Sequence, residues 1–183
     1  MSNIIKPPLI IKTERLILRP FELTDLESTH EYASDKANIE YMVYLPNETK
    51  QETEQFLKRV VADWERDTPQ AYEFAMIFND KHIGAVSLSL NEDRHEGELG
   101  WILHKDYQHK GYATEVAKAA LTFAIEDIKV KKVVAHYDYR NVPSYRIMQK
   151  IGLSLECDKG TRRNRNRGED TQEFKYSLIV DIN

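Results

Sequence analysis

The sequence is poor in cysteine and has no long apolar run. Cys157 is the single cysteine among 183 residues, so neither an internal disulfide nor a thiolate metal cluster can form. No segment approaches the roughly 20 apolar residues that a membrane-spanning helix needs. Near the start, Lys6 and two prolines interrupt the apolar residues, so we expect no signal peptide. These absences predict a cytoplasmic protein that does not contact membranes.

Strong charge of one sign and the familiar nucleotide-binding loops are also missing. The formal net charge is only −4, whereas a dedicated nucleic-acid binder usually has a clear basic excess, so no direct contact with nucleic acid is expected. The pattern G-x-x-x-x-G-K-[ST] of phosphate-hydrolysing enzymes is absent, and so is the G-x-G-x-x-G of dinucleotide dehydrogenases. With 41% hydrophobic and 31% charged residues, the composition is that of an ordinary globular domain. We expect one domain over residues 1–183.

Apolar periodicity predicts a mixed α/β fold. Seven β-like runs occur, and the four helical patterns lie near residues 24–34, 47–67, 112–128 and 142–152. The run "EGELGWILH", the third helix and "KKVVAHYDY" form a strand–helix–strand unit, which implies a parallel pair with a right-handed crossover. The other runs read as antiparallel neighbours. The sequence thus predicts a mostly antiparallel sheet of about seven strands, with a central parallel pair and about four flanking helices.

The junction between strand and helix at "YQHKGYATEV" could bind an anion. The first turn of a helix has N–H groups without partners and carries a partial positive charge. Gly111 precedes that turn and would let the backbone approach a phosphate closely. Gln108 and Lys110 could add side-chain donors. A glycine here could also simply turn the chain, and this stretch alone leaves both roles open.

A second pattern follows the next strand and favours the phosphate role. Asn141, Ser144 and Gly152 occur in "NVPSYRIMQKIGL", after "QHKGYA" in the preceding unit. In order, spacing and placement, the two stretches resemble the GNAT acetyltransferase superfamily. The stretches "TERLILRPFELTD" and "GYATEV" resemble its RimJ/RimL-type branch of N-acetyltransferases. The resemblance covers about residues 13–180.

The resemblance implies that the co-substrate is acetyl-CoA, with no metal. Its pyrophosphate would lie on backbone N–H groups at the start of the third helix, beside Gln108 and Lys110. Its pantetheine arm would run along the strand ending at Leu103, with Asn141 bonding it from the other side. The complete set of residues implied at this site is Trp101, Ile102, Leu103, Gln108, His109, Lys110, Gly111, Tyr112, Ala113, Thr114, Asn141 and Ser144.

Acetyl transfer to an amine needs a base, an oxyanion donor and, to a smaller extent, an acid. Glu98 is the leading candidate for the base, because it precedes Ile102 by four residues and shares its strand face. The alternatives are Glu96, His104, His136 and an ordered water. The oxyanion donor would be a strand N–H near Ile102 or Leu103.

The acid is less well defined, because Met148 stands where many family members have tyrosine. Ser144 is the candidate acid that the resemblance implies. Cys157 is expected to be a buried strand residue without an activating base, which favours direct sequential transfer over an acetyl-cysteine intermediate.

The acceptor amine should enter opposite the CoA. Aromatic and apolar candidates for that side are Phe21, Tyr41, Met42, Tyr44 and Trp64. A predicted loop over residues 159–170 adds Arg162, Arg163, Arg165 and Arg167. A charge run is usually only a solvated face. If the arginines do form a cationic rim, they disfavour polyamines and aminoglycosides.

Three hypotheses for the function stay open. The first is a protein N-terminal acetyltransferase, acting for example on a ribosomal protein. The second is a small-molecule amine acetyltransferase for a polyamine, an aminoglycoside or an amino-acid-like acceptor, and the third is a catalytically silent CoA-binding domain. The chain could be a monomer or a homodimer.

Overall fold

A computed structural model describes residues 9–43 and 47–180. Within these residues there are four α-helices: α1 (Leu26–Ser34), α2 (Lys50–Trp64), α3 (Tyr112–Thr122) and α4 (Val142–Lys150). A π-helical segment, Phe123–Ile128, continues α3, and short 3₁₀ turns occupy Leu23–Asp25 and Lys105–Tyr107. The strands are β1 (Ile11–Lys12), β2 (Ile17–Pro20), β3 (Ala71–Phe78), β4 (Lys81–Leu90), β5 (Glu96–Leu103), β6 (Lys132–Asp138), β7 (Ser154–Asn164) and β8 (Glu169–Ile179).

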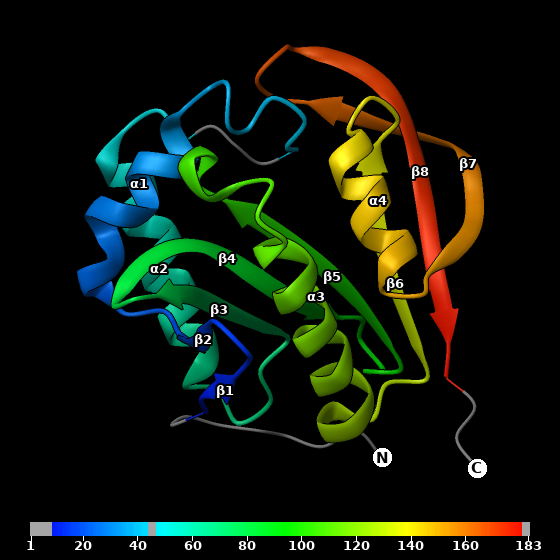
Figure 1. Cartoon of the computed structure of the whole chain (residues 1–183), viewed down its shortest axis with the longest axis horizontal. Coiled ribbons are helices and arrows are strands. Elements are labelled where there is room, and N and C mark those ends of the chain that lie inside the picture. Colours follow the sequence, from blue (N-terminus) through cyan, green and yellow to red (C-terminus); the bar gives the residue numbers. More distant parts are fainter. Residues whose placement is uncertain (1–8, 44–46, 181–183) are drawn as a thin grey trace.

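All the strands belong to one sheet in the order β1-β2-β3-β4-β5-β6-β8-β7 (Figure 1). Only β5 and β6 run parallel, as the strand–helix–strand pattern predicts, and the other neighbours are antiparallel. The described residues contain eight strands instead of about seven. The additional strand is β1, whose two residues are too few to show a periodic pattern and which is defined by pairing with β2.

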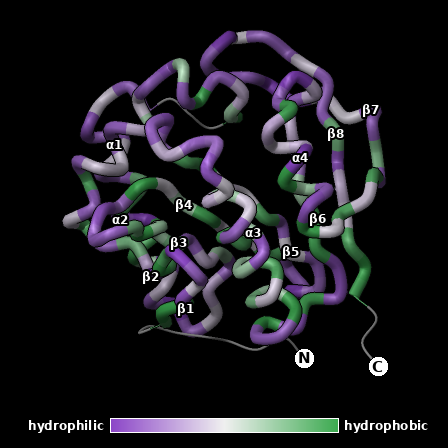
Figure 2. Tube along the Cα trace, viewed as in Figure 1, coloured by the Kyte–Doolittle hydropathy of each residue, from purple (hydrophilic) through white to green (hydrophobic). Residues whose placement is uncertain are grey.

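Helices cover the two faces of the sheet unequally. On one face, buried residues of α3 and its π-helical extension pack on the sheet, where the Phe123 ring meets the edges of Tyr72 and Phe74. α4 lies beside α3 on this face in Figure 1 and packs on β6. α1 and α2 cover β3 and β4 on the other face. The tube in Figure 2 is hydrophobic along the central strands and hydrophilic along much of β7 and β8.

The C-terminal hairpin extends further than the sequence predicts. Most of the predicted loop over residues 159–170 is strand, because β7 continues to Asn164 and β8 begins at Glu169. Cross-strand pairs such as Arg162 with Thr171 and Arg163 with Asp170 hold this extension together. The loop prediction was wrong because polar residues on both strands gave no alternation of apolar and polar positions.

Several residues expected at the acceptor side are part of the core. Phe21 and Trp64 are only 3% and 2% exposed, so neither can line an open acceptor site. Cys157 is exposed on β7, contrary to the expectation that it is buried. Tyr44 lies outside the described residues.

Candidate active site

A gap opens between β5 and β6. Their parallel pairing covers only Glu96 to Glu98, opposite Lys132 to Val134. Beyond Glu98 the two strands have no registered partners on that side, although each remains paired on its other edge with β4 or β8. The sheet is therefore splayed at its centre, where an extended ligand can add to the free edge of a strand.

Strand geometry decides which backbone groups face this gap. The N–H of His104 and the C=O of Glu96 bond towards β4, and successive residues of a strand alternate in direction. The backbone groups of Trp101 and the N–H of Leu103 therefore point into the gap. Those of Ile102 point to β4, where it is paired with Ala85. Of the residues expected along the pantetheine arm, Ile102 can contribute only its side chain.

The loop after β5 places a helix N-terminus at the gap. Gly111 precedes α3 with a φ of 84°, a left-handed conformation that favours glycine, and His109 also has a positive φ of 62°. Within residues 9–43 and 47–180 no side chain caps this helix, so the N–H groups of Tyr112, Ala113 and Thr114 lack a side-chain acceptor there. The cradle has the geometry that binds a phosphate or pyrophosphate.

The predicted donors beside the cradle are engaged within the protein. Gln108 Nε2 donates to the backbone oxygen of Leu103 and to Asn38 Oδ1, both at 3.1 Å. Lys110 Nζ donates to the backbone oxygen of Asp106 at 2.9 Å. In this arrangement Gln108 ties the loop to the end of β5, so its side chain shapes the cradle and does not reach across it.

An ionic clamp that sequence analysis missed holds the same loop from behind. Arg15 Nε donates to Glu115 Oε2 at 2.7 Å, Nη1 donates to the backbone oxygen of Lys110 at 2.9 Å, and the guanidinium lies 4.6 Å from the Tyr112 ring centre. Thr13 Oγ1 donates to the other Glu115 oxygen at 2.6 Å. Arg15 and Glu115 lie 100 positions apart, so no local pattern in the sequence predicts their contact. The one available signal was an acidic residue, Glu115, in the first turn of the predicted helix.

The start of α4 lies on the β6 side of the gap. Asn141 Oδ1 accepts from the backbone N–H of Ser144 at 3.2 Å and so caps this helix. Both side chains are half-buried, whereas Met148, one turn further on, is buried. Asn141 and Ser144 thus lie together at the start of α4, and Met148 packs in the core.

On the face that α1 and α2 leave open, Glu98 meets a histidine. His136 Nδ1 lies 3.0 Å from Glu98 Oε1. This hydrogen bond holds the pKa of Glu98 below its ordinary value and raises the pKa of His136. His104, by contrast, bonds the backbone N–H of Asp106 and lies 3.3 Å from Glu31, away from this pair.

The arginines of the β7–β8 hairpin do not form an unbalanced cationic rim. Each lies near a carboxylate: Arg162 by Glu173, Arg163 by Asp170, Arg165 by Glu52 and Arg167 by Glu40. Asn164 Nδ2 also donates to the backbone oxygen of Glu40 at 2.7 Å. The hairpin turn is therefore bound to the segment between α1 and α2, which crosses the same end of the sheet (Figure 1). Tyr41 lies in this contact, with Arg140 and Arg167 5.8 and 5.9 Å from its ring centre.

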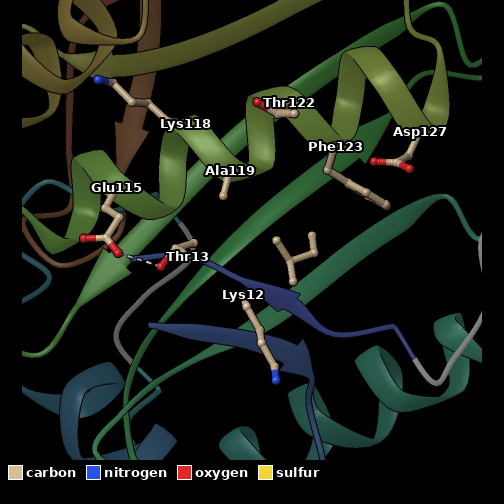
Figure 3. Close-up of a pocket in the computed structure, with 9 residues that line it drawn as sticks. Lys12, Thr13, Glu115, Lys118, Ala119, Thr122, Phe123 and Asp127 are labelled. Atoms are coloured by element: carbon tan, nitrogen blue, oxygen red, sulfur yellow. Dashed lines mark hydrogen bonds between the residues drawn. The ribbon is translucent and has the colours of Figure 1, made fainter. Parts of the chain in front are cut away.

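A groove of about 420 Å³ lies elsewhere, between the N-terminal segment and α3. Figure 3 shows Lys12 and Thr13 on one side of it and Glu115, Ala119 and Phe123 of α3 and its extension on the other. None of the predicted site residues lines this groove. In the described part of the chain there is also no cluster of three or more potential metal ligands, and no helix is long and apolar enough to cross a membrane.

Comparisons with known sequences agree with this geometry. A family model for the acetyltransferase (GNAT) domain matches residues 15–154. The uncharacterized N-acetyltransferase YnaD of Bacillus subtilis (strain 168) is 33% identical over 150 residues, which cover 80% of this chain and 83% of that protein. A spermidine N(1)-acetyltransferase of Escherichia coli (strain K12) is 26% identical over 140 residues, covering 76% of this chain and 73% of that enzyme.

Solved structures share the fold over nearly the whole chain. A GNAT-family acetyltransferase from Bacillus anthracis has a TM-score of 0.81 and 30% identity, covering 93% of this chain and 98% of that one. RimL, a ribosomal-protein N-acetyltransferase in complex with coenzyme A, has a TM-score of 0.82 at 17% identity, covering 96% and 100%. A spermidine N-acetyltransferase from Vibrio cholerae, in complex with CoA and spermine, has a TM-score of 0.78 at 20% identity, covering 90% and 95%. Because the family model spans most of the sequence and a relative more than 30% identical covers four-fifths of it, this protein belongs to the GNAT family of acetyltransferases.

Proposed function

We propose that this protein transfers an acetyl group from acetyl-CoA to a primary amine, in one direct step with both substrates bound. The observation that carries the proposal is the splayed β5–β6 gap, which ends at a helix N-terminus headed by Gly111. An extended chain with an anion at one end matches both features, and CoA is such a molecule. We infer one catalytic domain over the whole chain.

The residues present fit CoA. The N–H groups from His109 to Thr114 would hold the pyrophosphate, with the positive end of α3 behind them. The pantetheine arm would bond the free backbone groups of Trp101 and Leu103 in the manner of an added strand. Asn141 uses its Oδ1 to cap α4, so its amide N–H groups are the ones that would donate to the arm.

The same gap would supply the groups for acetyl transfer. The inward-pointing N–H of Leu103 or Trp101 is suited to stabilise the tetrahedral oxyanion. The base would come from Glu98 and the histidine bonded to it, and the Ser144 hydroxyl at the start of α4 would protonate the departing thiolate. Cys157 is exposed on β7, which β6 and β8 separate from β5, so an acetyl-cysteine intermediate has no support.

For the acceptor we propose the N-terminal α-amine of a protein, such as a ribosomal protein. In support, the fold is shared with RimL, and the acceptor side is bounded by the long β7–β8 hairpin, a surface that an extended peptide could contact. The second candidate is a polyamine. The ion-paired state of the hairpin arginines favours it, because carboxylates balance the positive charge that would repel such a cation.

A screen with acetyl-CoA would test this proposal. Purified protein is incubated with peptides bearing ribosomal-protein N-termini, with polyamines, with aminoglycosides and with amino acids, while release of the CoA thiol is followed. We expect release with peptides above the rate of hydrolysis without an acceptor. Release only with polyamines would replace the first acceptor by the second. Binding of acetyl-CoA without transfer to any amine would instead indicate a silent CoA-binding domain.

A further inference from the structure

We propose that His136 is the group that takes the proton from the acceptor amine, and that Glu98 is a positioning residue that orients and charges the imidazole. The inference rests on the proposed acetyl transfer and assigns its base. The base would then lie on β6, across the gap from β5, the strand that would hold the acetyl group.

The hydrogen bond between the two side chains fixes the state of the ring. Nδ1 of His136 lies 3.0 Å from Glu98 Oε1, and an ionised carboxylate can only accept hydrogen bonds. Nδ1 must therefore carry a hydrogen, which leaves the lone pair of the neutral ring on Nε2. Among the described residues Nε2 has no hydrogen-bond partner, and the side chain is 23% exposed. The ring is held on one side and open to a ligand on the other, as the histidine of a Ser-His-Asp triad is.

The register of the strands places this pair at the mouth of the gap. Glu98 is opposite Val134 in the last registered β5–β6 pair, and His136 is two residues further along β6 on the same face. From this point the strands diverge. An acceptor approaching the part of this face that α1 and α2 leave open would meet the His136 ring close to the place where the pantetheine arm would end.

Charges around the pair favour His136 as the base over Glu98. The hydrogen bond from His136, and the charges of Arg162 on β7 and Lys175 on β8, keep the pKa of Glu98 below its ordinary value. A carboxylate that is such a weak base cannot easily remove a proton from an amine near neutral pH. Glu98 and, more weakly, Glu173 on β8 raise the pKa of His136, while burial and Lys175 oppose this. His136 is therefore the stronger base of the two.

The step balances without any further reactant. The amine nitrogen forms a bond to the carbonyl carbon of the thioester, its proton passes to Nε2 of His136, and the C–S bond breaks. The products are the N-acetylated acceptor, CoA as a thiolate, and an imidazolium next to the Glu98 carboxylate. Loss of the imidazolium proton to water resets the site.

The pH dependence of kcat/KM separates the two assignments, because the bases differ in where they titrate. The acidic limb of the profile is the range in which kcat/KM falls on acidification. With His136 as base, the midpoint of this limb lies above the pKa of roughly 6.5 of an ordinary histidine. With Glu98 as base, the limb would lie below the roughly 4.3 of an ordinary glutamate. In Glu98→Gln the amide oxygen can still accept from Nδ1 but carries no charge, so we expect the limb to move to lower pH while activity above it largely remains.

His136→Gln should abolish the limb and lower kcat by about 10²- to 10⁴-fold, the usual contribution of a general base. His95→Gln is the matched control, because His95 also lies beside a carboxylate, Asp93 at 3.3 Å, but sits on the surface before β5. It should leave the profile unchanged. Binding of acetyl-CoA by calorimetry checks that each variant is folded.

Two results would overturn the assignment while leaving acetyl transfer intact. One is an active His136→Gln protein with the wild-type limb, and the other is a Glu98→Gln protein whose activity falls at every pH while the limb stays at its wild-type position. Failure of the proposed function itself looks different, since wild-type protein would then acetylate no amine in the screen.

Discussion

Substitution of Gly111 tests the proposed phosphate cradle most directly. Its φ of 84° is left-handed, and alanine in that conformation costs roughly 1–2 kcal/mol of folding free energy. A Cβ at this position would lie 3.3 Å from Arg15 Nη2, the end of a flexible side chain that can move by a few tenths of an ångström. Gly111→Ala should therefore fold, with a free energy of unfolding lower by roughly 1–2 kcal/mol and a melting temperature lower by about 2–8 °C.

The effect of Gly111→Ala on acetyl-CoA should exceed its effect on stability. If φ relaxes towards the ordinary helical region, the N–H groups at the start of α3 turn away from the pyrophosphate. Each charge-assisted hydrogen bond lost is worth about 1.5–3 kcal/mol, so the loss of one raises Kd roughly 10- to 100-fold. Gly111→Asp should weaken binding more than Gly111→Ala while costing less stability. Aspartate tolerates this conformation better, but its carboxylate repels the diphosphate, and Kd should rise by orders of magnitude.

Gly152→Ala provides the matched control. Gly152 has a φ of 91° after the end of α4, and a Cβ there would meet nothing within 4 Å. This variant should lose similar stability in urea unfolding but bind acetyl-CoA with wild-type affinity in calorimetry. If folded Gly111→Ala or Gly111→Asp also binds acetyl-CoA with wild-type affinity, the placement of the pyrophosphate at α3 is wrong.

Three further predictions concern Arg15, Ser144 and Asp138. Arg15→Ala removes the bonds to Glu115 and to the loop carbonyl of Lys110, so it should raise KM for acetyl-CoA with kcat little changed; an altered kcat at unchanged KM would contradict this role. Ser144→Ala should lower kcat with little effect on acetyl-CoA binding, and full activity would remove Ser144 as the acid. Burial would raise the pKa of Asp138, but hydrogen bonds from Arg140 hold it below its ordinary value. The ionised Asp138 therefore contributes its full stabilisation above the unfolded-state pKa, and this contribution is lost as pH falls towards the lower folded-state pKa. Asp138→Asn should have a lower free energy of unfolding than wild type at neutral pH. In urea titrations it should also lose less of that free energy on acidification than wild type does.

The acceptor side is where interpretation of the sequence was least reliable. An arginine-rich stretch indicates a cationic rim when only the sequence is considered, yet Glu40 and Glu52 approach Arg167 and Arg165 from the segment around α2. Phe21 and Trp64 suggested an aromatic acceptor pocket and instead fill the core. In both cases the decisive contacts come from segments distant in sequence, which a local pattern cannot contain.

The sequence by itself determined the order of the elements, the parallel pair and the position of Gly111 before α3. These depend on local physics: the period of apolar residues and the conformational freedom of glycine before the first turn of a helix. Only the tertiary structure decided that Arg15 clamps the cradle from the segment between β1 and β2, 100 residues away from Glu115, and that His136 meets Glu98 across the gap. The sequence contains both histidine and glutamate, but their bond depends on strand register and on the point where β5 and β6 part. Pairing of distant strands sets both features, and no single stretch of the chain specifies them.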